Sequence, residues 1–125
     1  MARVLIVDDS EFLADKIKRF FEAEGHEVVA IGEDGNQGVE LYKQHRPDLV
    51  TLDITMPNKD GHDCLADIMA FDSTARALMV SAIDDQSVIV NCMNIGAKGF
   101  IEKPLRLRDP EFCKAFIETV NEALK

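Results

Sequence analysis

From Val4 to Ser10 the chain reads VLIVDDS, four apolar residues followed by two carboxylates and a hydroxyl group. Similar short apolar runs recur along the chain, at residues 28–31, 49–52, 78–80 and 100–101. The runs are mostly continuous rather than alternating, which is typical of strands that are covered on both faces. We therefore interpret them as buried strands of one parallel sheet.

Helical patterns lie between these runs. Ser10 can cap a helix whose apolar side chains recur on one face, and Gly25 is well placed to end it. Further helices are expected over residues 36–44, 62–71 and 86–95, and Asp109-Pro110 fits the N-cap and first residue of a last helix. Five alternating strand–helix units predict an α/β fold: a doubly wound, five-stranded parallel sheet with right-handed crossovers and helices on both faces.

The composition is that of a single globular domain spanning residues 1–125, with 46% hydrophobic and 30% charged residues. The 23 acidic and 14 basic residues give a net charge of −9, which disfavours nonspecific binding to nucleic acid or to an anionic membrane. The three cysteines form no C-x-x-C pair, so they indicate neither a disulfide framework nor a zinc site. Because we find no signal-peptide pattern and no bilayer-length apolar run, we expect a cytoplasmic protein.

Polar side chains follow four of the apolar runs. Asp8 and Asp9 follow the first run, Asp53 the third, Ser81 the fourth and Lys103 the fifth. Each of these aspartates taken alone could be a turn or helix-cap residue. Parallel strands, however, place their carboxyl ends at one edge of the sheet, where such folds bind ligands. The sequence therefore predicts that these groups meet around one ligand.

Three carboxylates that converge in one crevice repel one another, and a bound cation is the usual remedy. Oxygen ligands favour a hard ion, and an incomplete acidic cup suits Mg²⁺, which shares its coordination sphere with water and substrate phosphate. Lys103 could pair with one phosphoryl oxygen, and the Ser81 hydroxyl could donate to another. Asp53, in the middle, is then a candidate nucleophile that forms an aspartyl-phosphate.

Four segments, in order, carry a family resemblance. They are VLIVDDS at 4–10, DLVTLDITMP at 48–57 with Asp60-Gly61, MVSA at 79–82, and GAKGFIEKP at 96–104. Together they resemble the receiver domain of two-component response regulators, and in particular its stand-alone chemotaxis type. The resemblance covers essentially the whole chain. It implies the flavodoxin-like strand order 2-1-3-4-5, for which chemotaxis receivers are a standard example.

The resemblance also implies roles for the site residues. Asp53 would accept a phosphoryl group from the phosphohistidine of a sensor kinase or of a histidine phosphotransfer protein. Asp9, Asp53 and the backbone carbonyl of Thr55 would hold Mg²⁺, while Asp8 would act on the metal mainly through water. Lys103 would contact the phosphoryl group and help to couple it to movement.

Phosphorylation in such a domain would draw Ser81 toward the phosphoryl oxygens and let the ring of Phe100 turn inward, a shift between two packings. An ordinary core role explains Phe100 as well as a switch does. The output would be a changed face of the fourth helix, fifth strand and fifth helix that binds a partner protein. We expect a monomer or weak dimer that catalyses its own phosphorylation and slow dephosphorylation and is otherwise no enzyme.

Two features depart from the family pattern, and a third follows it. Ile83 is apolar where some relatives are polar, and we expect it to slow self-dephosphorylation. Residues 105–109 form a longer connection than usual, and its two arginines could alter the choice of partner. The Lys103-Pro104 peptide bond is expected to be cis, as it commonly is in relatives.

Other functions stay open at the level of sequence. An aspartyl-phosphate phosphatase of the haloacid-dehalogenase type shares the Asp nucleophile, Mg²⁺ and Lys, but Asp53-Ile54-Thr55 lacks the second acid of its D-x-D motif. A flavodoxin-like cofactor carrier would bind phosphate where Asp8 and Asp9 repel it. The remaining alternative is a receiver-like module that binds partners without being phosphorylated, and the complete acidic set argues against it.

Overall fold

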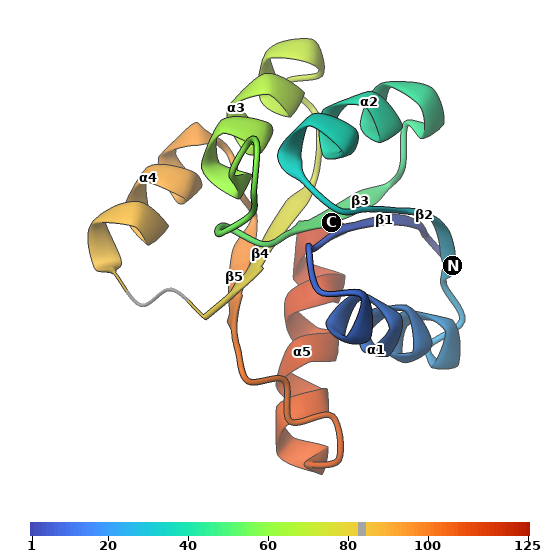
Figure 1. Ribbon diagram of the computed structural model, residues 1–125. Helices are drawn as coiled ribbons and strands as arrows, with labels where there is room; N and C mark the ends of the chain where they lie inside the picture. Colours follow the sequence, from blue (N-terminus) through green and yellow to red (C-terminus); the bar gives the residue numbers. More distant parts are fainter. Residues whose placement is uncertain (83–84) are drawn as a thin grey trace.

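The computed structural model describes residues 1–82 and 85–125. Strands and helices alternate, and the strands form one parallel sheet in the order β2-β1-β3-β4-β5 (Figure 1). The elements are β1 (Arg3–Val7), α1 (Glu11–Ala23), β2 (Glu27–Gly32), α2 (Gly35–His45), β3 (Leu49–Leu52), α3 (Gly61–Phe71), β4 (Ala77–Ser81), α4 (Gln86–Ile95), β5 (Gly99–Glu102) and α5 (Pro110–Ala123). The predicted α/β class and strand order are confirmed. Among the described residues, no helix has the length and apolar character that crossing a bilayer requires.

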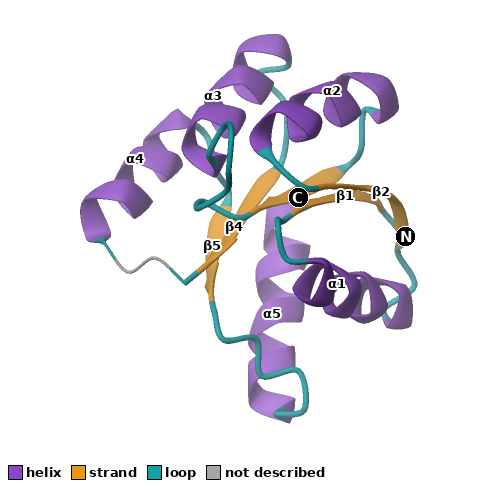
Figure 2. Cartoon of the chain, in the orientation of Figure 1, coloured by secondary structure: helices purple, strands orange, loops and turns teal. Residues whose placement is uncertain are grey.

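Helices cover both faces of the sheet, as Figure 2 shows: α2, α3 and α4 lie on one face, and α1 and α5 on the other. The first face buries a cluster that includes Leu5 and Leu65. The second buries a cluster that includes Val4, Ile17 and Phe116. Successive residues of β1 thus point into opposite apolar layers, which explains why this central strand reads as a continuous apolar run.

The register of the sheet positions the polar residues that follow the strands. The last residues of β1 and β3 pair with one another, so Asp8 and Asp53 leave adjacent strands at the same level. On the other side of β3, β4 ends at Ser81, which pairs with the residue that precedes Lys103. The chain therefore delivers its polar groups to a single edge, as the sequence predicted.

Each described helix begins with a side-chain N-cap. The capping residues are Ser10, Asp34, Asp60, Asp85 and Asp109. A capping oxygen accepts a hydrogen bond from a free N–H of the first turn, which helps to fix where the helix starts. The predicted starts of α1, α4 and α5 are confirmed, whereas α2 and α3 begin one residue earlier than the sequence indicated.

Three phenylalanines tie α1 to α5. Phe20 stacks on Phe116 with ring centroids 4.2 Å apart, and Phe21 meets the same ring edge-on at 6.0 Å. Phe21 and Phe116 are fully buried, whereas Phe20 is half-buried. Such aromatic pairs contribute about 0.5–1.5 kcal/mol each beyond the burial of their area. The contacts hold the two helices together along one side and leave the rest of Phe20 facing outward.

Candidate functional site

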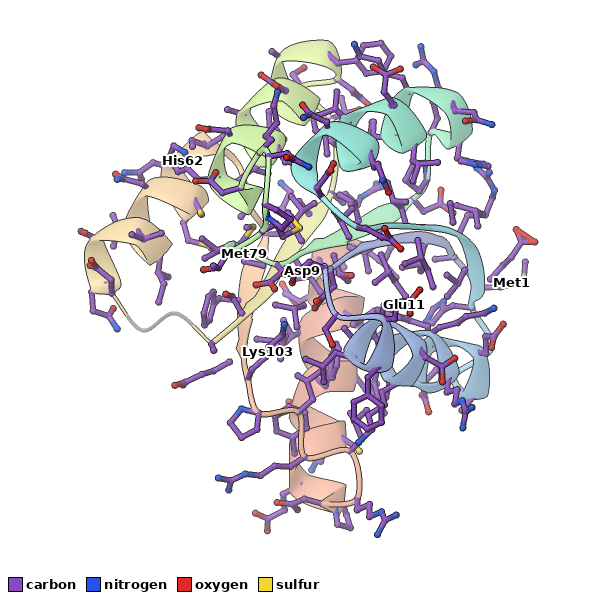
Figure 3. All side chains as sticks on the ribbon, viewed as in Figure 1. Met1, Asp9, Glu11, His62, Met79 and Lys103 are labelled. Atoms are coloured by element: carbon purple, nitrogen blue, oxygen red, sulfur yellow. The ribbon has the colours of Figure 1, made fainter. Side chains whose placement is uncertain are left out.

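The centre of the site is Asp53, the residue that follows β3. Its backbone N–H donates to the carbonyl of Val7 at 2.9 Å, so hydrogen bonding to β1 continues one residue past the strand. Its side chain is buried, and so are those of Asp8 and Ser81. Asp9 is exposed, and it lies with Lys103 at the same edge of the sheet (Figure 3). The site is thus a largely buried group of charges with one side open to water.

Asp53 has partners on both of its carboxylate oxygens. The Ser81 hydroxyl donates to Oδ1 at 2.9 Å, and the Lys103 ammonium donates to Oδ2 at 3.2 Å. Lys103 also donates to Oδ2 of Asp8 at 2.8 Å. One cation from the far end of the chain therefore bridges the carboxylates that follow β1 and β3.

The pKa values of these groups follow from burial and charge. Burial raises the pKa of Asp53 above its ordinary value, and the charge of Lys103 offsets this only in part. For Lys103, burial disfavours the charged form, but the hydrogen bond to Asp8 and the charge of Asp53 outweigh it and raise the pKa. Lys103 is therefore a fixed positive charge, while Asp53 is a carboxylate whose negative charge is incompletely compensated.

A hard cation fits the remaining charge. Asp8, Asp9 and Asp53 each offer an oxygen, and these three oxygens lie within 4.8 Å of one another. Lys103 supplies one positive charge against three carboxylates, so the site retains an excess of negative charge. Carboxylate oxygens with an open, wet side are the ligand set that suits Mg²⁺. The three carboxylates predicted as metal ligands therefore converge, and their chemistry fits a hard cation such as Mg²⁺.

The loop that follows Asp53 is anchored at several points. Its carbonyl at Ile54 accepts from the N–H of Gly61 at 2.8 Å, and its carbonyl at Lys59 accepts from the N–H of Gly35 at 2.9 Å. The Asn58 amide donates to Oδ2 of Asp34, the N-cap of α2, at 2.8 Å. Loop 54–60 includes Thr55, whose carbonyl is the predicted backbone ligand of the metal. These bonds hold the loop that carries Thr55 in place from α2 and α3.

Two glycines permit this close approach. A Cβ added to Gly61 would collide with the carbonyl oxygen of Asp53, and one added to Gly35 would collide with the carbonyl oxygen of Lys59. Asn58 itself has φ 67°, a left-handed conformation that asparagine tolerates better than most residues. The sequence analysis missed this set, although Asn58 after a proline and before Asp60-Gly61 is a recognisable turn signal.

The remaining predicted residues lie beside this centre. Phe100 is half-buried on β5 and packs against the core cluster under α2, α3 and α4. On α4, Val90 and Met93 are exposed. The Lys103-Pro104 bond is cis, as predicted. Ile83, on which the expectation of slow dephosphorylation depends, lies outside the described residues.

Known proteins resemble this chain over nearly its whole length. The profile of the response regulator receiver domain matches residues 4–112. The chemotaxis protein CheY of Bacillus subtilis is 44% identical over 122 residues, which cover 98% of this chain and 97% of that protein. CheY of Listeria monocytogenes is 45% identical over 106 residues, covering 85% of this chain and 89% of that protein.

Solved structures give the same result. A chain in the crystal structure of the CheX–CheY–BeF3–Mg complex from Borrelia burgdorferi superposes with a TM-score of 0.90 at 39% identity, covering 98% of this chain and 89% of that one. The response regulator domain of Thermotoga maritima CheB superposes with a TM-score of 0.86 at 31% identity, covering 98% and 95%. With its fold, its acidic edge and these relatives, the chain belongs to the response regulator receiver family, among the CheY-like signalling proteins of two-component systems.

Proposed function

We propose that the chain is a phosphorylation-switched chemotaxis-type signalling protein, in which Asp53 accepts a phosphoryl group from a phosphohistidine. The donor is a sensor histidine kinase or a histidine phosphotransfer protein. The observation that carries the proposal is the pair of contacts to Asp53, from Ser81 on one oxygen and from Lys103 on the other. A structural turn carboxylate would need neither partner, whereas a phosphoryl acceptor needs cationic and hydroxyl groups around it.

In this reaction an oxygen of Asp53 attacks phosphorus, the new O–P bond forms, and the N–P bond of the donor breaks with its electron pair returning to the imidazole. Lys103 holds a positive charge next to the developing phosphoryl oxygens, and Ser81 is within reach to donate to one of them. Asp9, Asp53 and the Thr55 carbonyl would hold Mg²⁺, with Asp8 acting through water. Bound there, the ion would neutralise further phosphoryl charge.

The proposed switch follows from the contacts that phosphorylation must replace. A phosphoryl group on Asp53 would compete for the hydroxyl of Ser81 and the ammonium of Lys103. In the unphosphorylated structure both groups bond to the Asp53 carboxylate. Movement of Ser81 at the end of β4 would let the half-buried Phe100 on the neighbouring β5 change its packing. The two packings then differ in the face formed by α4, β5 and α5. Phosphorylation of Asp53 favours the packing that makes the better contacts with the phosphoryl group.

The output of this face is contact with another protein. The Borrelia burgdorferi relative was crystallised with CheX, and the exposed Val90 and Met93 give α4 an apolar surface that suits such a contact. We assign residues 1–125 to one receiver domain that works in the cytoplasm as a monomer or weak dimer. The only reactions it catalyses are the phosphorylation of its own Asp53 and the slow hydrolysis of that phosphoryl group.

The test is intact mass spectrometry after incubation with Mg²⁺ and acetyl phosphate, with Asp53→Asn as the matched control. We expect the wild type to gain the mass of one phosphoryl group and the variant to gain none. No gain in the wild type, with Mg²⁺ binding and an active donor both verified, would contradict the proposal. It would favour instead a receiver-like module that binds partners without being phosphorylated.

A further inference from the structure

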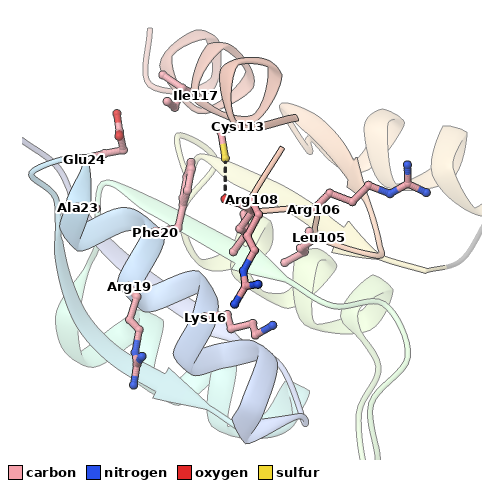
Figure 4. A pocket seen from close by; sticks show the side chains of 11 residues that line it. Lys16, Arg19, Phe20, Ala23, Glu24, Leu105, Arg106, Arg108, Cys113 and Ile117 are labelled. Atoms are coloured by element: carbon pink, nitrogen blue, oxygen red, sulfur yellow. Dashed lines mark hydrogen bonds between the residues drawn. The ribbon is translucent and has the colours of Figure 1, made fainter. Parts of the chain in front are cut away.

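A cavity lies away from the acidic edge, between α1 and the segment that leads from β5 into α5. It is a cleft of about 620 Å³ on the α1–α5 side of the sheet (Figure 4). Its lining comes from the second half of α1, from residues 105–108 and from the first turns of α5. Asp8, Asp9, Asp53, Ser81 and Lys103 are not among its lining residues. The cleft is therefore separate from the proposed phosphorylation site.

The charge of this cleft is opposite to that of the whole chain. The protein has a net charge of −9. The charged side chains that line the cleft are four basic ones and one acidic one: Lys16, Arg19, Arg106, Arg108 and Glu24. All five are exposed. Because salt screens charges beyond about 8 Å at physiological ionic strength, this local excess of positive charge, rather than the distant net charge, decides which ligand is held here.

The two arginines of the loop are the most available of these cations. Arg19 already pairs with Asp15 at 3.0 Å, and the ammonium of Lys16 lies over the ring of Phe12, 4.5 Å from its centroid. Within the described part of the chain, neither Arg106 nor Arg108 makes an ion pair or a side-chain hydrogen bond. Figure 4 shows the guanidinium group of Arg108 beside Lys16 at the cleft, whereas that of Arg106 points away from α1 at the rim. Both side chains are exposed, and Arg106 also lines a neighbouring pocket with Glu102, Asp109 and Glu111.

The floor of the cleft is apolar. Phe20, Leu105, Leu107 and Ile117 line it, and all four are half-buried. The backbone there is held from α5, since the thiol of Cys113 donates to the carbonyl of Leu107 at 3.2 Å. A cavity with an apolar floor and a cationic rim is complementary to a ligand that presents apolar and anionic groups together.

We propose that this cleft is a docking site for an acidic peptide segment of a partner protein, which inserts a large apolar side chain between α1 and residues 105–108. The carboxylates of the segment pair with Arg106 and Arg108, which can each bind a carboxylate through two parallel hydrogen bonds. The apolar side chain covers Phe20 and Ile117. Nucleic acid fits less well because its phosphates would leave this apolar floor uncovered.

The direct test is selection from a displayed random-peptide library on the immobilised wild-type protein, with depletion on Arg106→Glu/Arg108→Glu. The peptides recovered are expected to combine Asp or Glu with Phe, Leu, Ile or Met. Recovery of basic or uncharged peptides, or of none that distinguish the two proteins, would overturn the proposal.

The selected peptide, labelled with a fluorophore, then serves as the probe in anisotropy titrations. We expect Arg106→Glu/Arg108→Glu to weaken its binding at least about tenfold, and added salt to weaken binding to the wild type. Lys43→Glu/Lys98→Glu makes the same change in net charge outside the cleft, so it should bind within about twofold of the wild type. Equal weakening by both double variants would mean that net charge, not the cleft, holds the peptide.

Two further measurements distinguish this proposal from the proposed function at Asp53 and from self-association of the chain. Asp53→Asn changes no lining residue of the cleft and should bind the probe as the unphosphorylated wild type does, so a failure of the proposed function at Asp53 would leave this result standing. Sedimentation equilibrium tests a second copy of the chain as the occupant. A dimer that Arg106→Glu/Arg108→Glu abolishes would assign the cleft to self-association and would refute docking of an acidic partner segment.

Discussion

Two loops leave the same edge of the sheet, and they are held in different ways. Loop 54–60, after β3, is fixed from outside by hydrogen bonds to Gly35, Gly61 and Asp34. The connection 103–109, after β5, starts from a bond between the Lys103 N–H and the Ser81 carbonyl. Beyond that bond it relies on half-buried leucines, a local turn and the thiol of Cys113.

The difference in how the two backbones are held matches the functional groups that each loop carries. Loop 54–60 carries the carbonyl of Thr55, a predicted metal ligand, and a ligand must be held within a fraction of an ångström to be useful. Connection 103–109 carries Arg106 and Arg108, whose long side chains find a partner by their own rotation. A fixed backbone therefore suits chemistry at Asp53, and an exposed, locally held backbone suits recognition. Changes in loop 54–60 should consequently cost more stability than changes at residues 104–109, which follow the ion-paired Lys103.

The largest effect is expected for Gly61→Ala. The added methyl group collides with the carbonyl of Asp53, and relief of that collision must move either β3 or the start of α3. We expect a loss of about 3 kcal/mol in the free energy of unfolding, measured by urea denaturation. Gly25→Ala is the control, because it meets no neighbour and carries only the strain of φ 86°, about 1 kcal/mol. Equal losses would show that loop 54–60 yields easily.

Next in size is Lys103→Met, at the junction between β5 and the second loop. The change removes the cation that bridges Asp8 and Asp53, so two buried carboxylates face each other. We expect a loss of about 2 kcal/mol without divalent ions, and a smaller loss when Mg²⁺ is added. In an Asp53→Asn background the same change should cost less, because one carboxylate is already neutral. Identical losses in both backgrounds would argue against this electrostatic cause.

Asn58 is expected to matter moderately and for two separable reasons. Asn58→Ala removes the hydrogen bond to Asp34 and places alanine at φ 67°, with a combined loss of about 1–2 kcal/mol. Asn58→Gly removes only the hydrogen bond, so it should regain about 1 kcal/mol of that loss. If glycine is as destabilising as alanine in thermal unfolding, the backbone at Asn58 is not strained.

Asp34 gives the first loop a dependence on pH. The backbone N–H of Gln37 and the Asn58 amide both hold the pKa of Asp34 below the ordinary value of an aspartate. A carboxyl group with a lowered pKa in the folded state stabilises above its unfolded pKa, and this contribution disappears as pH falls through the folded value. Asp34→Ala should therefore be less stable than the wild type near neutral pH, and the difference should shrink in acid, as pH falls below the ordinary pKa of an aspartate. Denaturation curves along a pH series test this.

The smallest effect on stability is expected for Arg108→Ala in the second loop. The side chain is exposed and makes no ion pair among the described residues, so we expect a change within about 0.5 kcal/mol. Thermal unfolding measures this. A loss comparable to that of Asn58→Ala would mean that connection 103–109 is as firmly held as loop 54–60.

The sequence predicted the structure best where hydrophobic residues recur with a regular period and where a residue type strongly favours one structural role, such as a helix cap. Strand positions, the caps at Ser10 and Asp109, the end of α4 at Gly96 and the convergence of Asp8 with Asp53 all follow from local patterns and the rule that parallel strands share an edge. The strand order came from the family resemblance, because five apolar runs alone permit several orders.

Contacts between distant residues were less accessible. Nothing local to Asn58 indicates that Asp34 is its partner, because that contact depends on how α2 and the β3–α3 loop pack. The bridge from Lys103 to Asp8 likewise joins residues 95 positions apart. The cleft beside Phe20 needs three segments to be placed before it exists. Such features arise from tertiary packing, which residue patterns constrain only indirectly.

The packing of α2 against α3 has a consequence for optical measurements. The chain has one tyrosine and no tryptophan, so Tyr42 is its only strong chromophore near 280 nm. Its ring is buried, and its hydroxyl donates to Asp72 at 3.0 Å. Intrinsic fluorescence therefore reports on this layer alone and is insensitive to α1 and α5, where the aromatic residues are phenylalanines. A tryptophan at Phe20 would give the opposite layer a signal of its own, so that the two sides of the sheet could be followed separately during unfolding.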